Sequence, residues 1–341
     1  LELGCDVVTE KPMTTDEVRC RRILRTVSET GRNCQVTFNY RYAPVRSQVC
    51  ELLRDGVIGE VLSVDFCWLL DTRHGADYFR RWHRRRENSG SLLVHKATHH
   101  FDLVNWWLDD VPEEVFCQGS LRYYTPEHAE ALGLGDRAER CLHCPAAERC
   151  NFHVNLAERE RHKALYLDCE AEDNYYRDRC VFSDQVNIWD TMSLQVRYAG
   201  GALLNYMLHA YSPYEGYKIA FNGRKGRLEH EACEATYMSG DGTVPGELEK
   251  GRTSVTLIPE FSKPQSLEPR LAKGGHGGAD PILLGDVFLP EPPADPLRRK
   301  ANQVDGAYSI LIGVAGYHSI DSGRPVRIAD LLGGAPLGER W

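Results

Sequence analysis

The sequence has no apolar run long enough to cross a membrane and no excess of positive charge. A spanning helix needs about 20 consecutive apolar residues, and none occurs among the 341 residues. The first residues also lack the basic start and small-residue cleavage site of a signal peptide. A net charge of -8 excludes, as a general partner, nucleic acid or an anionic membrane, because both favour a basic surface. We therefore expect a cytoplasmic protein that binds a small molecule.

A glycine-rich phosphate loop in its proper context is missing as well. The segment Gly133-Leu-Gly135-Asp-Arg-Ala138 has G-x-G-x-x-A spacing, but it follows the polar segment 126–131 rather than a strand. We interpret it as a chance match. The chain begins without Met, in what reads as the end of one element before a buried strand, and we expect a truncated start.

Cysteine is present twelve times, yet most of these residues stand alone in a large chain without a signal peptide. We therefore expect most of them to be reduced and buried rather than paired in disulfides. The spacing Cys141-x2-Cys144-x5-Cys150, with Cys180 as a fourth thiolate, predicts a structural zinc site. The alternatives are free thiols in a loop or an iron-sulfur cluster. Three other side chains could replace one ligand: Cys169, His143 and His153.

The first 40 residues have the pattern of a parallel α/β sheet. Residues 6–9 predict a short buried strand that ends at Glu10-Lys11-Pro12, because Pro12 has no N–H for a further ladder bond. Thr14 and Glu17 have capping-box spacing and predict a helix that stops at Gly31, and residues 36–40 predict the next strand. Ligands gather at the carboxyl ends of such strands. Lys11 is therefore predicted to lie at a ligand-binding edge.

Downstream, the pattern changes to helices and antiparallel strands. Helices are predicted from Pro44 to about residue 55 and over residues 101–108. Strands are predicted at 62–68 and 114–118, and residues 194–208 predict a hairpin around Gly200-Gly201. A last helix is expected from residue 304 to Gly323. The fold class is therefore α/β and α+β, with an open, mostly antiparallel sheet.

A histidine cluster lies within residues 90–102. One turn of helix would place His95 and His99 on one face, with Asp102 three residues beyond His99. A neutral imidazole can accept a hydroxyl proton near pH 7, and a carboxylate can orient it. The alternative is a set of core histidines beside Trp106 and Trp107.

Taken together, several segments resemble the Gfo/Idh/MocA family, which is named after glucose-fructose oxidoreductase, inositol dehydrogenase and a rhizopine-catabolism protein. The likeness covers nearly the whole chain. The segments that carry it are Glu10-Lys11-Pro12, Asn39-Tyr40-Arg41, Trp82-His-Arg84, residues 90–102, Gly223-Arg-Lys-Gly226-Arg-Leu-Glu229 and Ser322-Gly-Arg-Pro-Val326.

The resemblance implies a domain organisation and a cofactor. Residues 1–43 would be the C-terminal remnant of a Rossmann domain that binds NAD or NADP. Residues 44–302 would form the substrate and dimerisation domain, with a cysteine-rich insertion at about 124–180. Residues 303–330 would form a helix that packs back on the Rossmann part. The family's open sheet often forms a subunit interface, so a homo-oligomer is expected.

The resemblance also implies roles for particular residues. Lys11 would be the active-site lysine and His99 the catalytic histidine. His95 stands where many members carry Asp or Glu, so Lys96 or Asp102 is an alternative acid partner. The remaining matches are Glu10, Pro12, Asn39 and Arg84 on the cofactor side, and Tyr40, Lys96, His276 and Asp280 on the substrate side.

The implied reaction is hydride transfer between a nicotinamide cofactor and a hydroxyl-bearing carbon of a sugar, polyol or inositol-like substrate. Two alternatives remain open at this point. One is an NAD-dependent glycosidase that oxidises its substrate transiently. The other is a binding or scaffold protein without a cofactor, in which the histidines pack or bind a metal.

Without a phosphate loop, a dinucleotide loses the backbone donors and the helix N-terminus that hold its pyrophosphate. We therefore expect the 341-residue chain to bind NAD(H) or NADP(H) weakly or not at all. Isothermal titration calorimetry measures this directly, and tight binding would contradict the expectation.

Overall fold

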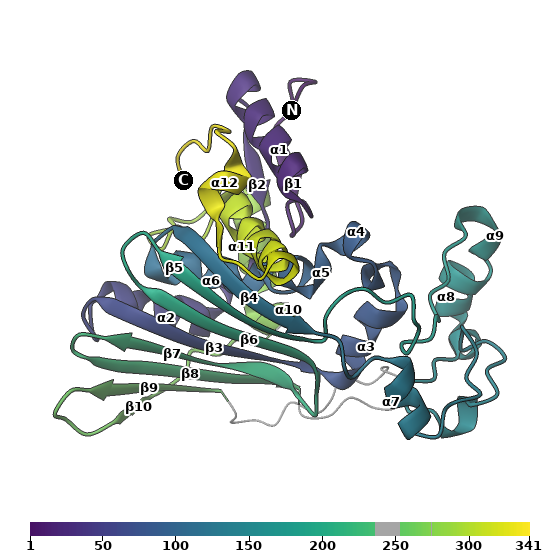
Figure 1. Ribbon diagram of the computed structural model, residues 1–341. Coiled ribbons are helices and arrows are strands. Elements are labelled where there is room, and N and C mark those ends of the chain that lie inside the picture. Colours follow the sequence, from purple (N-terminus) through teal and green to yellow (C-terminus); the bar gives the residue numbers. More distant parts are fainter. Residues whose placement is uncertain (236–252, 274) are drawn as a thin grey trace.

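The computed structural model describes residues 1–235, 253–273 and 275–341. A small sheet near both termini stands above one edge of a much larger sheet (Figure 1). In the small sheet, β1 (Val7–Thr9) pairs in parallel with β2 (Cys34–Val36), and β11 (Ala301–Asn302) pairs antiparallel with β2. The predicted first strand is confirmed, and its carboxyl end leads into Lys11.

Helix α1 (Glu17–Thr30) connects the two parallel strands. Its N-cap is Asp16, whose carboxylate accepts a hydrogen bond from the backbone N–H of Arg19, so the capping box predicted at Thr14 is wrong. Gly31 ends the helix with a left-handed φ of 62°, as predicted. The strand predicted to continue to residue 40 is also wrong, because the chain leaves the sheet after Val36 and forms a buried 3-10 turn, η1 (Asn39–Tyr42).

The large sheet has nine strands in the order β10-β9-β8-β7-β3-β6-β5-β4-β12. Only β3 and β6 pair in parallel; the other neighbours are antiparallel. The strands are β3 (Val61–Asp71), β4 (Pro112–Ser120), β5 (Thr191–Tyr198), β6 (Leu203–Ser212), β7 (Glu215–Gly223), β8 (Gly226–Ala235), β9 (Ser254–Pro259), β10 (Gln265–Leu267) and β12 (Val326–Arg327). This confirms the open, mostly antiparallel sheet.

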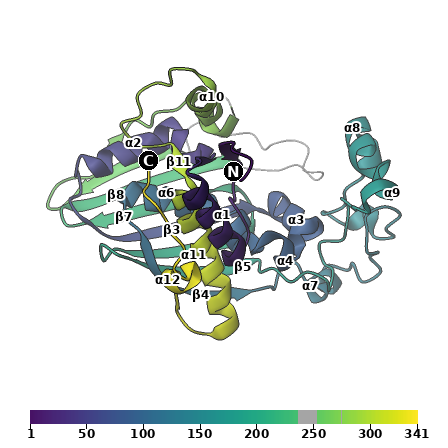
Figure 2. The same ribbon diagram turned by 90° about the horizontal axis from the view of Figure 1, so that it is seen from above.

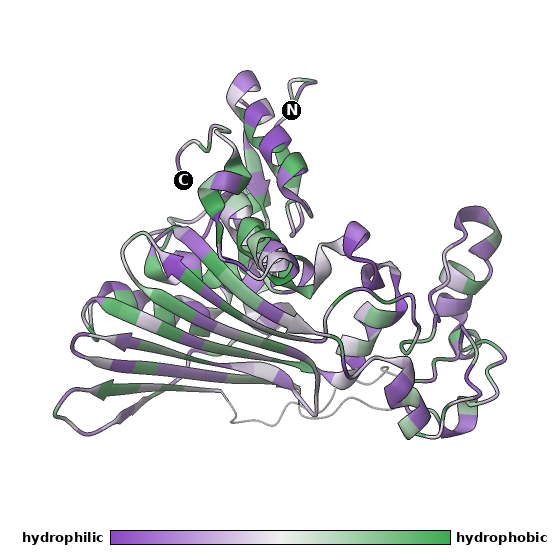
Figure 3. Ribbon diagram, in the orientation of Figure 1, coloured by the Kyte–Doolittle hydropathy of each residue, from purple (hydrophilic) through white to green (hydrophobic). Residues whose placement is uncertain are grey.

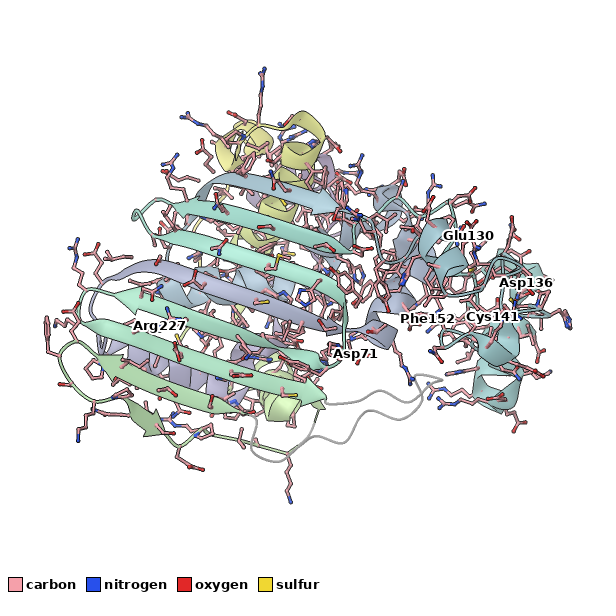
Figure 4. The ribbon with its side chains drawn as sticks, turned by 60° about the horizontal axis from the view of Figure 1, so that its bottom comes forward. Asp71, Glu130, Asp136, Cys141, Phe152 and Arg227 are labelled. Carbon is pink, nitrogen blue, oxygen red and sulfur yellow. The ribbon has the colours of Figure 1, made fainter. Side chains whose placement is uncertain are left out.

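One face of this sheet is covered by helices (Figure 2). The helices on this side of the sheet, some of which pack on other helices, are α2 (Pro44–Arg54), α3 (Thr72–Arg80), α4 (Arg86–Ser89), α5 (Ser91–His95), α6 (Thr98–Leu108), α10 (Gly275–Phe288), α11 (Gln303–Ser322) and α12 (Ile328–Leu332), with a 3-10 turn η2 (Trp82–Arg84). Residues alternate between buried and exposed along β5 and β6, and the colouring of the strands alternates with them (Figure 3). No described helix covers the opposite face (Figure 4). Assembly through that face stays a prediction.

Residues 121–190, here called the cysteine lobe, project beyond α3 at one end of the large sheet (Figure 1). The lobe contains only short helical segments and one isolated bridge between Arg140 and Arg179. The segments are α7 (Pro126–Ala131), η3 (Ala147–Arg149), η4 (Leu156–Glu158), α8 (Glu160–His162), the π-helical turn η5 (Lys163–Leu167) and α9 (Glu170–Asp173). The cysteine-rich insertion predicted at about residues 124–180 stays a prediction.

No helix in the described ranges is both long and apolar enough to traverse a bilayer.

A buried ion group joins the small sheet to the helical layer. Arg41 in η1 donates to both carboxylate oxygens of Asp102 in α6, at 2.8 and 2.5 Å, and lies 3.1 Å from Asp305 in α11. The three side chains are at most 6% exposed. Asp102 therefore serves to hold η1, α6 and α11 together.

Helix α11 approaches α5 so closely that one position admits only glycine. A Cβ atom at Gly313 would lie 2.4 Å from the backbone oxygen of Leu93. Because backbone atoms cannot yield as a flexible side chain can, the helices would have to separate.

We expect Gly313→Ala to lower the free energy of unfolding by about 1–3 kcal/mol. Gly135→Ala is the matched control, since a Cβ there meets nothing within 4 Å. Urea titration of both variants measures the difference, and equal stability of the two would refute the close packing of α5 on α11.

Candidate active site

Lys11 lies just beyond the end of β1, and its Nζ donates to the backbone oxygen of His95 at 3.5 Å. The Lys11–Pro12 peptide bond is cis. Burial and the nearby ammonium of Lys96 lower the pKa of Lys11 to about 8, against a smaller opposing effect of Glu10. Glu10 itself turns outward, where it accepts from the backbone N–H of Lys11 and from Thr37. The fold thus brings a partly buried lysine to the edge at which it was predicted.

His99, in the first turn of α6, presents its ring face to Tyr40. The two ring centroids are 4.1 Å apart with an interplanar angle of 9°, and the guanidinium of Arg46 lies 3.9 Å from the Tyr40 ring. Within the described ranges, Nδ1 of His99 is buried and has no hydrogen-bond partner. Burial, with the charges of Lys11 and Lys96, lowers the pKa of His99 well below its usual value. The imidazole is therefore neutral at pH 7.

His95 and His99 do not share one helix, so the single helical turn predicted for them is wrong. Helix α5 ends at His95 and α6 begins at Thr98. The ring of His95 turns toward His83 instead, with 3.1 Å between the two Nε2 atoms. Burial is the main cause that lowers the pKa to about 2 for His95 and about 3 for His83. Both rings are neutral, so one Nε2–H donates to the other ring.

A second charged cluster adjoins this site. Lys96 in it was predicted from the sequence, but its partners Glu215 and His74 were missed. Lys96 lies 3.2 Å from Glu215 in β7 and 4.7 Å from the ring centre of Trp68, and Nδ1 of His74 lies 2.7 Å from the same carboxylate. Burial opposes ionisation of Glu215, but Lys96 and His74 outweigh it and lower its pKa to about 2. No local motif marks Glu215, because its partners are more than 100 residues away in the sequence.

Three predicted substrate-side or cofactor-side residues meet at the start of α10. Asn39 donates to Asp280 at 3.2 Å, and Nδ1 of His276 lies 2.9 Å from the same carboxylate. The ring centroid of His276 is 6.4 Å from that of Tyr40. This group therefore adjoins the ring that stacks on His99.

Two residues predicted for the site, Asp102 and Arg84, hydrogen-bond to other parts of the fold. The carboxylate of Asp102 is occupied by Arg41 and does not hydrogen-bond to the ring of His99. Arg84 donates to Gln185 at 2.5 Å and to Ser183 at 3.4 Å, both in the cysteine lobe. Both side chains use their charge to hold elements together, which sequence spacing could not reveal.

The five cysteines of the cysteine lobe, Cys141, Cys144, Cys150, Cys169 and Cys180, are free thiols. Cys141, Cys144, Cys150 and Cys180 line one small cavity of about 20 Å³ in the cysteine lobe, whereas Cys169 does not. Across the described ranges, no group of three or more His, Cys, Asp or Glu side chains stands as placed in an arrangement that could hold a metal ion. The predicted zinc site therefore stays a prediction.

Comparison with known proteins identifies the class. Residues 50–328 match the model of the Gfo/Idh/MocA oxidoreductase family, C-terminal alpha/beta domain. The chain is also 40% identical to a Bacillus subtilis (strain 168) protein named as an oxidoreductase, YteT, over 97% of this chain and 78% of that protein. The chain therefore belongs to the Gfo/Idh/MocA oxidoreductase family.

More distant relatives carry named activities. An inositol 2-dehydrogenase of Rhizobium meliloti (strain 1021) is 31% identical over 33% of this chain and 32% of that protein. Among solved structures, levoglucosan dehydrogenase in complex with NADH covers 96% of this chain and 74% of its own, with a TM-score of 0.63 and 16% identity. Aldose-aldose oxidoreductase from Caulobacter crescentus, in complex with glycerol, covers 96% and 73%, with a TM-score of 0.57 and 15% identity. At these identities the two structures show the shared fold.

The depressed pKa of Lys11 has a consequence for stability. A lysine whose pKa is lower in the folded state than its usual 10.5 lowers the free energy of unfolding. The loss of stability is complete below pH 8, where Lys11 is charged in both states, and it disappears as the pH rises from about 8 to 10.5. We expect Lys11→Met to raise the free energy of unfolding at pH 7 by roughly 1–3 kcal/mol, with a smaller gain at pH 10.

Lys163→Met is the control, because Lys163 pairs with Asp168 on the surface of the cysteine lobe, where both side chains are half exposed. Denaturant titrations at both pH values measure the effect. A Lys11→Met variant that is no more stable than the control at pH 7 would contradict the assignment.

Proposed function

We propose that the protein is an NAD(P)-dependent oxidoreductase that transfers hydride between the cofactor and a hydroxyl-bearing carbon of a sugar, polyol or inositol-like substrate. The observation that carries the proposal is the electrostatic effect of Lys11, which follows β1, on the neutral ring of His99 in α6. Family membership supports the redox class, and the named activities of the distant relatives support the substrate class.

The residues present fit the nicotinamide side of such a cofactor. Lys11 follows the carboxyl end of a parallel strand, the edge at which dinucleotides bind in α/β sheets. Nδ1 of His99 and Oδ1 of Asn39 are buried polar atoms without a hydrogen-bond partner in the described part of the chain, and such atoms normally have a partner. The cofactor, when bound, supplies the acceptor or donor of the hydride.

Lys11 binds the reacting oxygen of the substrate. With a pKa of about 8, its side chain is mostly an ammonium at pH 7, and it donates a hydrogen bond to the hydroxyl or carbonyl oxygen. In a partly buried site this interaction strengthens as negative charge develops on the oxygen. Its position is fixed by the contact of Nζ with the backbone oxygen of His95.

His99 accepts the hydroxyl proton when an alcohol is oxidised and returns it when a carbonyl is reduced. Only a neutral imidazole can accept a proton, and burial together with two neighbouring ammonium groups keeps the ring neutral. Stacking against Tyr40 holds the ring in one orientation.

The remaining polar groups suit a substrate with several hydroxyls. His276, which pairs with Asp280, lies near the ring of Tyr40. Lys96, which pairs with Glu215, lies over the ring of Trp68, and Trp68 adjoins Tyr40. Such mixed donors and acceptors hydrogen-bond to hydroxyl groups at fixed positions. We therefore expect these side chains to select among sugars and polyols.

We expect Lys11→Met and His99→Asn each to lower kcat/KM about 10²- to 10⁴-fold in the full-length protein. Lys163→Met should retain full activity. The assay follows formation of the reduced cofactor with NAD or NADP across a panel of sugars, polyols and inositols, and circular dichroism checks that each variant is folded.

Turnover unchanged in both variants would overturn the assignment of Lys11 and His99. A free sugar released from a glycoside without net formation of reduced cofactor would instead indicate the glycosidase reaction. Product analysis in the same assay separates these outcomes.

A further inference from the structure

The cysteine lobe has little regular structure of its own to hold it together. Its helical segments are three to six residues long, and its one bridge joins Arg140 to Arg179. Units of this size commonly need a disulfide or a metal in addition to their apolar contacts. None of the five cysteines in this lobe forms a disulfide.

The bridge brings distant cysteines together. Cys141 and Cys180 directly follow its two residues, and their backbone N–H groups donate to the backbone oxygens of Asp178 and Glu139. Cys144 follows in a tight turn in which its N–H donates to the oxygen of Cys141. With Cys150, the four thiols line the same cavity of about 20 Å³. Figure 4 shows Cys141 and Phe152 within this lobe, well apart from Arg227 on the sheet.

One of the four sulfurs accepts a backbone hydrogen bond, because the N–H of Ala138 donates to Cys144 Sγ at 3.4 Å. A backbone donor of this kind stabilises the thiolate of a metal site.

Positive charge surrounds the same sulfurs. A divalent ion with four thiolates carries a net charge of -2, which is costly to bury without compensation. Arg80, at the end of α3, donates to Cys141 Sγ at 3.8 Å, and Arg137 also lines the cavity. The cations therefore lie where the negative charge would be.

We propose that Cys141, Cys144, Cys150 and Cys180 together bind one zinc ion, which organises the cysteine lobe. Binding replaces the S–H bonds with Zn–S bonds and releases the protons to water, without any transfer of electrons. Four cysteine thiolates are a complete ligand set for one tetrahedral zinc ion.

In the structure the four cysteines are thiols, and their sulfurs are not arranged around a metal position. Neutral thiols have no reason to converge, whereas thiolates converge on a dication. Rotation about χ1 moves each sulfur without moving the backbone. Arg80 contacts Cys141 Sγ, and Arg137 lines the cavity in which the sulfurs would meet the ion.

Zinc in the lobe would also steady the candidate active site. Helix α3 carries His74, which contacts Glu215, at one end and Arg80, which contacts Cys141 and the oxygen of Phe152, at the other. A further ion pair joins Asp77 of α3 to Arg177 of the lobe at 2.7 Å. A lobe that loses its ion would therefore loosen the far end of α3.

The test is the metal content of the 341-residue chain, purified under reducing conditions without a chelator and measured by inductively coupled plasma mass spectrometry. We expect about one zinc per chain in the unmodified protein and in Cys169→Ser. Cys169 is the matched control, because it belongs to the same lobe but its Sγ faces the backbone oxygen of Ala164. Cys144→Ser and Cys180→Ser should retain roughly tenfold less zinc or lower.

A second measurement does not depend on whether the variants fold. Chelation of the unmodified chain should release the zinc, lower the Tm and make residues 121–190 the first sites of limited proteolysis, with the sheet still resistant. Absence of zinc both after purification and after reconstitution with zinc under reducing conditions would overturn the proposal. So would iron in place of zinc, equal zinc in all variants, or disulfides among the four cysteines in intact-mass analysis. None of these measurements depends on the redox activity proposed above.

Discussion

The buried ion group of Arg41, Asp102 and Asp305 is the constraint on which the candidate site depends. It ties η1 to α6 and α11, three elements that lie far apart in the sequence. Tyr40 precedes Arg41 directly, and His99 lies one helical turn before Asp102, so the same ion group sets the stacking distance between the two rings. Buried charges are tolerated only when their hydrogen bonds are satisfied, and here the carboxylate of Asp102 accepts from two nitrogens of one guanidinium. Loss of either partner would leave a buried charge at the joint between the two sheets.

Next to this ion group, the candidate site combines the ammonium groups of Lys11 and Lys96 with neutral imidazoles. Lys96 is neutralised by Glu215, whereas Lys11 has a depressed pKa and donates to a backbone oxygen. This arrangement is unfavourable for folding, but it leaves an ammonium whose charge acts on a neutral proton acceptor. Destabilised polar groups of this kind are expected where a fold binds and transforms a ligand.

Local patterns in the sequence predicted the elements well. The strand before Lys11, helices α2, α6 and α11 and the hairpin of β5 and β6 all appear close to where periodicity, Pro44 and the glycines placed them. The errors arose where long-range contacts override local pattern. Residues 39–42 form a buried turn and no strand, because this turn places Arg41 in a hydrogen-bonded ion pair with Asp102.

The candidate site was predicted only in part for the same reason. Lys11 and His99 could be found from motifs, but the partners of Asp102, His95 and Arg84 lie 12 to 101 residues away in the sequence. Glu215 and His74 carry no motif at all, although they complete the charge balance around Lys96. Spacing along one helix cannot reveal such pairs, since they are made by the tertiary fold.

The central claim is that His99 is held as a neutral imidazole beside the ammonium of Lys11. The most direct test is the pKa of His99 measured by NMR titration of the histidine rings in the unmodified chain and in Lys11→Met. The account predicts a pKa well below 6.5 that rises when the neighbouring ammonium is removed. A His99 that titrates at or above 6.5 in the unmodified chain, or whose pKa does not change in Lys11→Met, would contradict it.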